Sequence, residues 1–272
     1  MTGVADGGED RGVQPGPLLH LPRGTRACLF DMDGVLTRTE NLHERAWHRS
    51  LTAFLDEWSE RTGRPVAPYD DRVDYDRYID GRRRLDGVRS FLASRGITLD
   101  EGTPDDPAGF ATVQGVGRAK NCIWLRLLDA EGAQLEPGAR EYLAAVKAAG
   151  LWTALVSSSA NAGAVVERAG VARLLDVRVD GAVARNKNLC GKPSPDTFLE
   201  AADRLGVEPP QAAVFEDAVA GVQAGRAGGF GCVVGISRVT SRTDSLVAAG
   251  ADLVATDLAA LGQGNLDWPT RT

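Results

Sequence analysis

ACLFDMDGVLT, residues 27–37, is the stretch from which the fold of this chain can be worked out. Its first four residues are apolar, and they lead directly into Asp31, Asp33 and the turn residue Gly34. A short apolar run of this kind indicates a strand that is buried on both faces, as in a parallel sheet. Ligands of α/β proteins bind at the carboxyl ends of such strands, so we expect the two aspartates at the edge of a ligand site.

Beyond residue 136 the chain alternates between short apolar runs and amphipathic stretches. Strands are expected at 151–156, 177–179, 212–215, 231–234 and 252–254, and helices over 139–149 and after residues 161, 195 and 217. This alternation predicts an α/β fold with a doubly wound parallel sheet.

About 90 residues separate the first strand from this alternation, and their pattern is helical. Apolar residues recur at intervals of three and four from 40 to 58 and again further along the chain. We interpret residues 45–133 as a helical cap domain inserted into an α/β core formed by residues 25–44 and 134–272. Residues 1–24 are rich in glycine, proline and charge, and we expect them to form a flexible tail.

Composition limits the classes of partner. The chain has 272 residues, a formal net charge of −6 and a pI near 5.2, which argues against general binding to nucleic acids or anionic membranes. Its four cysteines are scattered and form no CxxC pair, so neither a zinc site nor a disulfide framework is suggested. No secretion signal is recognised, and no run approaches the ~20 apolar residues that span a bilayer. We expect a cytoplasmic protein that binds no nucleic acid or membrane and has no obligate protein partner.

Polar residues follow several of the expected strands, and parallel topology would bring them to one edge of the sheet. They are Asp31 with Asp33, Ser157, Lys192, and Glu216 with Asp217. Carboxylate pairs suit Mg²⁺, a hydroxyl and an ammonium suit phosphate oxygens, and an aspartate beside a metal suits nucleophilic attack. Together these groups predict phosphoryl transfer.

Each of these residues has a plainer interpretation when it is taken alone. The aspartate pair could cap a turn, Ser157 or the acids at 216–217 could begin a helix, and Lys192 could be a surface lysine. Their occurrence together and in this order favours the catalytic interpretation.

In these four motifs the chain resembles the haloacid dehalogenase superfamily: DMDGVLT at 31–37, Ser157 after a strand, GKPSPD at 191–196 and FEDAVAG at 215–221. The resemblance implies a Rossmann-like core with a helical cap. It implies that Asp31 is the nucleophile and Asp33 the general acid/base, and that Ser157 and Lys192 hold the phosphoryl group. For Mg²⁺ it implies Asp31, the backbone carbonyl of Asp33 and Asp217, with Glu216 beside them.

Further residues resemble the β-phosphoglucomutase subfamily. They are Thr39, His43, Arg84 in GRRR, Lys120 and Asn121 in AKN, Ser159 and Asn161. The resemblance implies that Arg84, Ser159, Asn161 and Asn121 hold a second phosphate, the one that is not transferred. His43 and Lys120, together with Thr39, would link closure of the cap to the acid/base.

Two positions depart from the pattern of this subfamily. Arg38 stands where an aspartate is common, and Ala160 stands where a lysine is common. Arg38, Arg82 or Arg83 could offset the missing lysine, but the sequence does not place their side chains. A solvated basic face is the default interpretation for Arg82 and Arg83.

The resemblance implies a Mg²⁺-dependent phosphotransferase that acts on a small sugar phosphate. Its expected reaction interconverts β-D-glucose 1-phosphate and glucose 6-phosphate through an aspartyl-phosphate and β-glucose 1,6-bisphosphate, which would also be the activator. The first alternative is a sugar-phosphate phosphatase, which transfers the phosphoryl group to water. The second is a catalytically silent domain that binds sugar phosphates.

Overall fold

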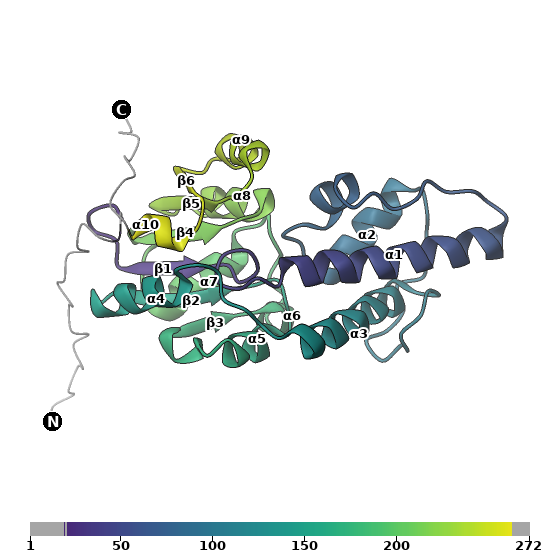
Figure 1. Cartoon of the computed structure of the whole chain (residues 1–272), viewed down its shortest axis with the longest axis horizontal. Coiled ribbons are helices and arrows are strands. Elements are labelled where there is room, and N and C mark those ends of the chain that lie inside the picture. Colours follow the sequence, from purple (N-terminus) through teal and green to yellow (C-terminus); the bar gives the residue numbers. More distant parts are fainter. Residues whose placement is uncertain (1–18, 20, 263–272) are drawn as a thin grey trace, which may run out of the picture.

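The computed structural model describes residue 19 and residues 21–262, so the predicted tail falls largely outside the described residues. Within them, six parallel strands form one sheet in the order β3-β2-β1-β4-β5-β6 (Figure 1). The strands are β1 Ala27–Phe30, β2 Trp152–Val156, β3 Val177–Val179, β4 Ala212–Glu216, β5 Cys232–Ile236 and β6 Leu253–Ala255. The predicted doubly wound parallel sheet is confirmed, and β1 lies at its centre.

Helices cover both faces of this sheet, which explains why its central strand β1 is apolar throughout. In β1, Cys28 and Phe30 belong to one hydrophobic cluster, and Ala27 and Leu29 belong to the other. The first cluster includes residues of α4 Ala139–Ala148, α5 Ala162–Arg168 and α10 Leu258–Leu261. The second includes residues of α6 Gly181–Asn186, α7 Asp196–Leu205, α8 Val219–Ala227 and α9 Thr240–Ala249. All four residues of β1 are fully buried between the two layers.

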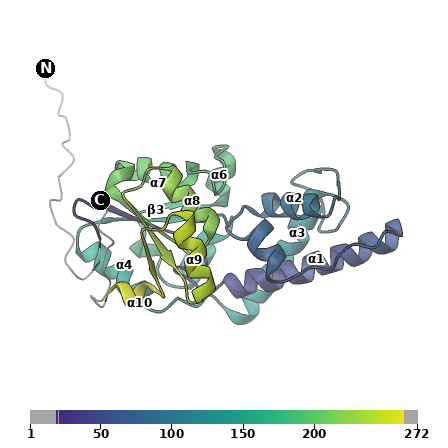
Figure 2. The same cartoon turned by 90° about the horizontal axis from the view of Figure 1, so that it is seen from above.

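A second helical body, which we call the cap, lies beyond the carboxyl edge of the sheet (Figures 1 and 2). It contains α1 Glu40–Thr62, the π-helical turn Tyr75–Ile79, α2 Arg84–Ser94 and α3 Val113–Glu131. This body has its own hydrophobic cluster, in which Leu51, Phe54, Phe91 and Val116 are fully buried. Helix α1 continues through the predicted limit between residues 44 and 45 without a break.

The two connections between core and cap lie side by side. The backbone N–H of Arg38 donates to the carbonyl of Gln134 at 2.8 Å, and that of Glu136 donates to Leu36 at 2.9 Å. The Glu136 carboxylate also lies 3.1 Å from Arg38 Nε and 2.7 Å from an Arg238 nitrogen. Arg38, which departs from the subfamily pattern, therefore belongs to this double linker.

Candidate active site

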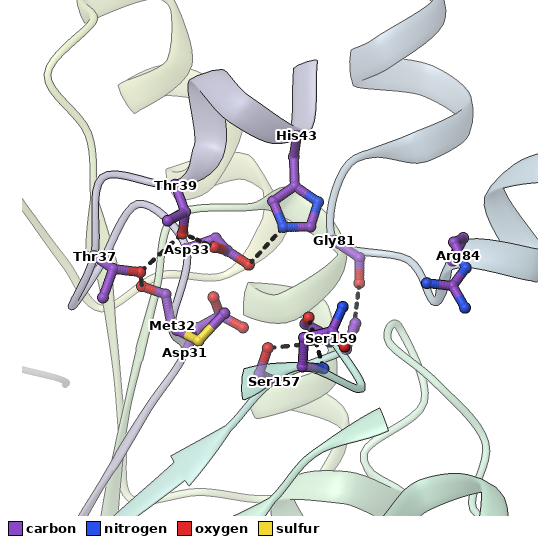
Figure 3. A network of polar contacts seen from close by, with 12 residues as sticks. Asp31, Met32, Asp33, Thr37, Thr39, His43, Gly81, Arg84, Ser157 and Ser159 are labelled. Atoms are coloured by element: carbon purple, nitrogen blue, oxygen red, sulfur yellow. Dashed lines mark hydrogen bonds and ion pairs between the residues drawn. The ribbon is translucent and has the colours of Figure 1, made fainter. Parts of the chain in front are cut away.

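The carboxyl edge of the sheet and the underside of the cap enclose a cavity of about 280 Å³. Most of the predicted site residues line it: Asp31, Asp33, His43, Arg84, Lys120, Asn121, Ser157, Ser159, Asn161, Glu216 and Asp217. The two others, Thr39 and Lys192, contact Asp33 and Asp31 respectively. Figure 3 shows Asp31 near Ser157, and Arg84 on the cap, apart from them. The fold thus brings the predicted residues together at one place.

Asp31, at the end of β1, pairs with a buried lysine. Lys192 Nζ donates to Asp31 Oδ1 and lies 2.5 Å from an oxygen of Glu216. Burial by itself lowers the pKa of Lys192, but the Asp31 and Glu216 carboxylates outweigh burial and raise that pKa above its ordinary value. Lys192 is therefore a fixed positive charge beside Asp31, suited to neutralising phosphate oxygens.

Glu216, the last residue of β4, is engaged on both of its oxygens. One faces Lys192, and the other accepts hydrogen bonds from the backbone N–H groups of Asp217 and Ala218 at 3.0 and 3.1 Å. Gly221 makes room for this carboxylate, because an ideal Cβ at 221 would lie 1.9 Å from it. Glu216 thus positions Lys192 and the start of α8.

The residues present fit a hard divalent cation. Among residues 19 and 21–262, no group of three or more His, Cys, Asp or Glu side chains is arranged to hold a metal ion. The predicted ligand set needs only two such side chains, Asp31 and Asp217, together with the backbone carbonyl of Asp33. At the sheet edge of the cavity Lys192 pairs with Asp31 and Glu216, and the Asp217 carboxylate lies at the same edge. Carboxylate and carbonyl oxygens suit Mg²⁺, which keeps further positions for water and phosphate.

Asp33 contacts Thr39, which directly precedes α1, and His43 of α1. Thr39 Oγ1 donates to Asp33 Oδ1, and the hydroxyls of Thr37 and Thr39 are 2.9 Å apart. The other carboxylate oxygen, Oδ2, lies 3.7 Å from His43 Nε2 (Figure 3). This geometry orients Asp33 toward the cavity, where a proton would be exchanged with a bound hydroxyl.

His43 contacts Lys120 of α3 from the opposite side. Lys120 Nζ lies 2.7 Å from His43 Nδ1, and it lies 5.1 Å from the centre of the Trp47 ring. Burial, followed by the nearby charges of Lys120 and Arg84, holds the pKa of His43 well below its ordinary value. A neutral imidazole that accepts through Nδ1 carries its proton on Nε2, the nitrogen that faces Asp33.

Lys120 itself is 3% exposed and lies among aromatic rings. Burial first, and then the charge of Arg84, lower its pKa well below the ordinary value, while Asp33 opposes the change. Trp124 also lies close, with its ring centroid 4.8 Å from that of His43 and 6.0 Å from Lys120 Nζ. Our sequence analysis did not identify Trp124.

Arg84 marks the other end of the cavity. Its Nη1 donates to Asn121 Oδ1 at 2.5 Å, and Asn161 Nδ2 donates to the same oxygen at 3.0 Å. Nε of Arg84 is buried and has no hydrogen-bond partner among the described residues. In the loop after β2, the backbone N–H of Asn161 donates to Ser159 Oγ at 3.2 Å. Arg84 of the cap and Asn161 of the core thus bring nitrogen donors to one end of the cavity, which suits the binding of an anion.

The segment before α2 rests on the core. Ser158 Oγ donates to the carbonyl of Gly81 at 3.1 Å, and an ideal Cβ at Gly81 would lie 3.1 Å from Ala218 Cβ. Arg83 donates to the carbonyl of Leu189 at 2.9 Å, in the loop that leads to Lys192. Arg83, which we expected to be a solvated residue by default, therefore joins cap to core.

This site combines a buried aspartate, a fixed ammonium, a second aspartate held by Thr39 and a group of nitrogen donors at the far end of the cavity, inside an α/β fold. Such a combination defines an enzyme that transfers phosphoryl groups. A family model described as haloacid dehalogenase-like hydrolase matches residues 25–229. The chain belongs to this family. Enzymes of this kind use Mg²⁺, in agreement with the donor set described above.

Relatives with named activities agree with this class. A protein of Mycobacterium tuberculosis named beta-phosphoglucomutase is 52% identical over 246 residues, which cover 90% of this chain and 94% of the relative. A phosphorylated carbohydrates phosphatase of Thermotoga maritima is 27% identical over 83% of this chain and 91% of the relative. The crystal structure of a putative beta-phosphoglucomutase from Thermotoga maritima superposes with a TM-score of 0.58 at 27% identity, covering 87% of this chain and 96% of that one.

No helix in residues 21–262 combines the length and the apolar character needed to cross a membrane.

Proposed function

We propose that this enzyme is a β-phosphoglucomutase, which interconverts β-D-glucose 1-phosphate and glucose 6-phosphate. The observation that carries the proposal is two groups of anion donors in and beside one cavity. Lys192 and Ser157 lie beside Asp31 at the sheet edge, and Arg84 and Asn161 lie under the cap, so we assign one phosphate to each group. A mutase needs both, because its bisphosphate intermediate carries a phosphate at each end. The 52% identity to a protein named beta-phosphoglucomutase supports the same reaction.

In this mechanism a carboxylate oxygen of Asp31 attacks the phosphorus of β-glucose 1,6-bisphosphate. The P–O bond to the sugar breaks, and the sugar oxygen takes a proton from Asp33. In the reverse step Asp33 accepts the proton of a sugar hydroxyl, whose oxygen attacks the aspartyl-phosphate and restores the Asp31 carboxylate. Release and rebinding of the intermediate in the opposite orientation completes the exchange, and the bisphosphate also serves as activator.

Mg²⁺, held by Asp31, Asp217 and the carbonyl of Asp33, would supply positive charge that reduces repulsion between the nucleophile and the phosphate. Lys192 adds a second fixed charge on the same side, and Ser157 would orient the phosphate oxygens. His43 Nε2 faces Asp33 Oδ2 at 3.7 Å, and His43 also contacts Lys120 of the cap, so we infer that the surroundings of the acid/base depend on the position of the cap. The glucose ring would lie between the two phosphate places.

The alternative is a sugar-phosphate phosphatase, for which the relative named phosphorylated carbohydrates phosphatase gives a specific reason. Both activities share formation of the aspartyl-phosphate and differ in its acceptor. To favour a sugar hydroxyl over water a thousandfold takes about 4 kcal/mol of differential transition-state stabilisation. Orientation of the sugar by Arg84 and exclusion of water by the cap can supply it.

One assay separates the candidates. Purified protein and Mg²⁺ are mixed with β-glucose 1-phosphate, with and without β-glucose 1,6-bisphosphate, and glucose 6-phosphate and free phosphate are both quantified. We expect glucose 6-phosphate in excess of phosphate and a strong dependence on the bisphosphate. Phosphate release alone would establish the phosphatase, and absence of both products would favour the silent domain. The proposed cytoplasmic location and the expected lack of nucleic-acid, membrane and obligate protein partners stay predictions.

A further inference from the structure

Six cationic side chains line the cavity: Arg82, Arg83, Arg84, Arg89, Lys120 and Arg185. Most of them are already engaged. Arg83 and Arg89 pair with Asp86, at 2.6 and 2.7 Å, and Lys120 and Arg84 make the contacts described above. Arg82 and Arg185 have no hydrogen bond or ion pair from their side chains among the described residues.

Arg185 lies on the short helix α6, at the end of the core that faces the cap (Figure 2). Gly181, four residues earlier, presents the same face of this helix. An ideal Cβ at Gly181 would lie 2.5 Å from the carbonyl oxygen of Ser158 and 2.9 Å from the backbone nitrogen of Ala160. This face of α6 therefore packs directly under the 158–160 loop, and Arg185 enters the cavity beside it.

Ala160 is the one residue between Ser159 and Asn161, and its side chain has no hydrogen-bond donor for an anion. It lines the cavity and offers only a methyl group. Arg84, which lines the same cavity, keeps a buried Nε without a hydrogen-bond partner among the described residues. After burial, the charge of Arg185 is the largest influence that lowers the pKa of Arg84. Two guanidinium groups that line one cavity and repel each other are stabilised by an anion between them.

We propose that Arg185 binds the phosphate that is not being transferred, together with Arg84, and supplies the positive charge that Ala160 does not. This inference rests on the proposed function, since it assigns Arg185 to the second phosphate of the same reaction. By this assignment, the positive charge that the core contributes to the second phosphate comes from α6 and not from the loop after β2.

The test uses the full chain with three substitutions, Arg185→Ala, Arg185→Lys and the matched control Lys187→Ala. Lys187 follows α6 directly, pairs with Glu200 at 2.6 Å and does not line the cavity, so its removal changes net charge equally. We expect Arg185→Ala to raise the KM for β-glucose 1-phosphate about tenfold or more, the effect of losing one charge-assisted hydrogen bond. Arg185→Lys should recover part of the loss, and Lys187→Ala should behave as wild type.

Hydrolysis of acetyl phosphate provides the internal comparison, because this donor occupies only the place beside Asp31. Loss of mutase flux in Arg185→Ala should exceed any loss of acetyl phosphate hydrolysis about tenfold. Equal losses in both activities, or a KM equal to that of Lys187→Ala, would overturn the assignment.

Binding separates this inference from the proposed function. In an Asp31→Asn background, which cannot turn over, calorimetry with Mg²⁺ measures the affinity for β-glucose 1,6-bisphosphate. Adding Arg185→Ala should weaken this binding about tenfold, whichever acceptor the wild type uses. If the wild type only hydrolyses its substrate, the mutase proposal fails and the binding comparison still decides on Arg185. If the Asp31→Asn protein does not bind the bisphosphate, both proposals fail.

Discussion

The carboxylate of Asp217 occupies the space beside Gly34 in which any other residue would carry its β-carbon. An ideal Cβ at Gly34 would lie 2.1 Å from Asp217 Oδ2, and the backbone of Gly34 has a φ of +81°. The turn after β1 and the carboxylate after β4 are therefore in direct contact. Because Asp31 and the carbonyl of Asp33 precede this turn, all three proposed Mg²⁺ ligands depend on the absence of a side chain at position 34.

Gly34→Ala should therefore damage both stability and Mg²⁺ binding. Gly63→Ala is the matched control, because Gly63 has a φ of +68° but nothing within 4 Å of its ideal Cβ. The control should lose about 1 kcal/mol from backbone strain alone and keep its activity. Thermal unfolding and activity against Mg²⁺ concentration measure the two effects. Equal unfolding temperatures for the two variants, with equal Mg²⁺ requirements, would contradict the role given to the contact between Gly34 and Asp217.

Asp31→Asn should abolish formation of the phosphoenzyme, since an amide oxygen cannot act as the nucleophile. We expect turnover to fall by about a thousandfold or more. Intact-protein mass spectrometry after incubation with acetyl phosphate would report the covalent adduct, and the same spectrum excludes deamidation back to aspartate. Substantial turnover by the pure, folded variant would rule out Asp31 as the nucleophile.

Asp33→Asn removes the group proposed to exchange the proton and leaves the nucleophile in place. Turnover should fall by about 100-fold to 10,000-fold, the usual range for loss of a general acid/base. Acetyl phosphate has a good leaving group, so it should still phosphorylate Asp31 in this variant. A sugar phosphate and acetyl phosphate that slowed to the same degree would argue against the acid/base role.

Asp217→Ala should raise the Mg²⁺ concentration needed for half-maximal activity by more than about tenfold. Asp217→Asn keeps the shape that fits against Gly34, so it separates loss of charge from loss of packing. Titration of activity with Mg²⁺ gives the half-saturation of each variant. The metal role would be wrong if wild type and both variants shared one value.

Arg84→Ala should lower the ratio of mutase to phosphatase activity, because it removes the donor nearest the proposed second phosphate. A loss of about tenfold or more in glucose 6-phosphate formation is expected, with a smaller change in acetyl phosphate hydrolysis. An equal fractional loss in both activities, or none in either, would refute binding of the second phosphate by Arg84. The phosphatase would then be the better proposal.

Asp176 offers a prediction about pH and stability away from the site. Lys147 Nζ lies 2.5 Å from its carboxylate, and the backbone N–H of Thr153 donates to it at 2.9 Å. Burial by itself raises the pKa of Asp176, but these hydrogen bonds prevail and lower it below 3.8. The carboxylate therefore stabilises the fold above that pH, and the contribution is lost as the pH falls through the lowered pKa.

Asp176→Asn should accordingly cost no more than about 1 kcal/mol at pH 7, after allowance for solvent screening. The difference from wild type should shrink as the pH falls below 3.8. Denaturant unfolding at several pH values measures it. Asp129→Asn serves as the control, because the pair of Asp129 with Arg168 is exposed and should contribute little. A pH-independent difference for Asp176→Asn would contradict the ionic origin.

The order of strands could be predicted because most strands are short runs of mainly apolar residues, and several helices end at a glycine. Gly150, after α4, is an example, with a φ of +74°. Helix α9 was not anticipated, since its exposed Val247 and polar residues give little apolar periodicity. The five-residue turn Tyr75–Ile79 was missed for another reason, because it is too short for periodicity to reveal.

In the site, the residues at strand ends could be placed because parallel topology brings strand ends together. Contacts between distant segments could not be placed. The pairing of Arg38 with Glu136 spans 98 positions, and no local pattern connects them. The presence of Arg185 and Arg84 in one cavity depends equally on how α6 packs under the loop after β2, which only the tertiary structure determines.

The central position of β1 also bears on how the chain is made. Ala27 is aligned with Trp152 on one side and with Ala212 on the other, so β1 has no partner in this sheet until more than about 100 further residues have been synthesised. At ordinary rates of translation this delay is on the order of ten seconds. The whole cap emerges during that interval and carries its own hydrophobic cluster. We expect the cap to fold first, so that Asp31 and Asp33, which follow β1, have the folded cap beside them before the sheet around β1 forms.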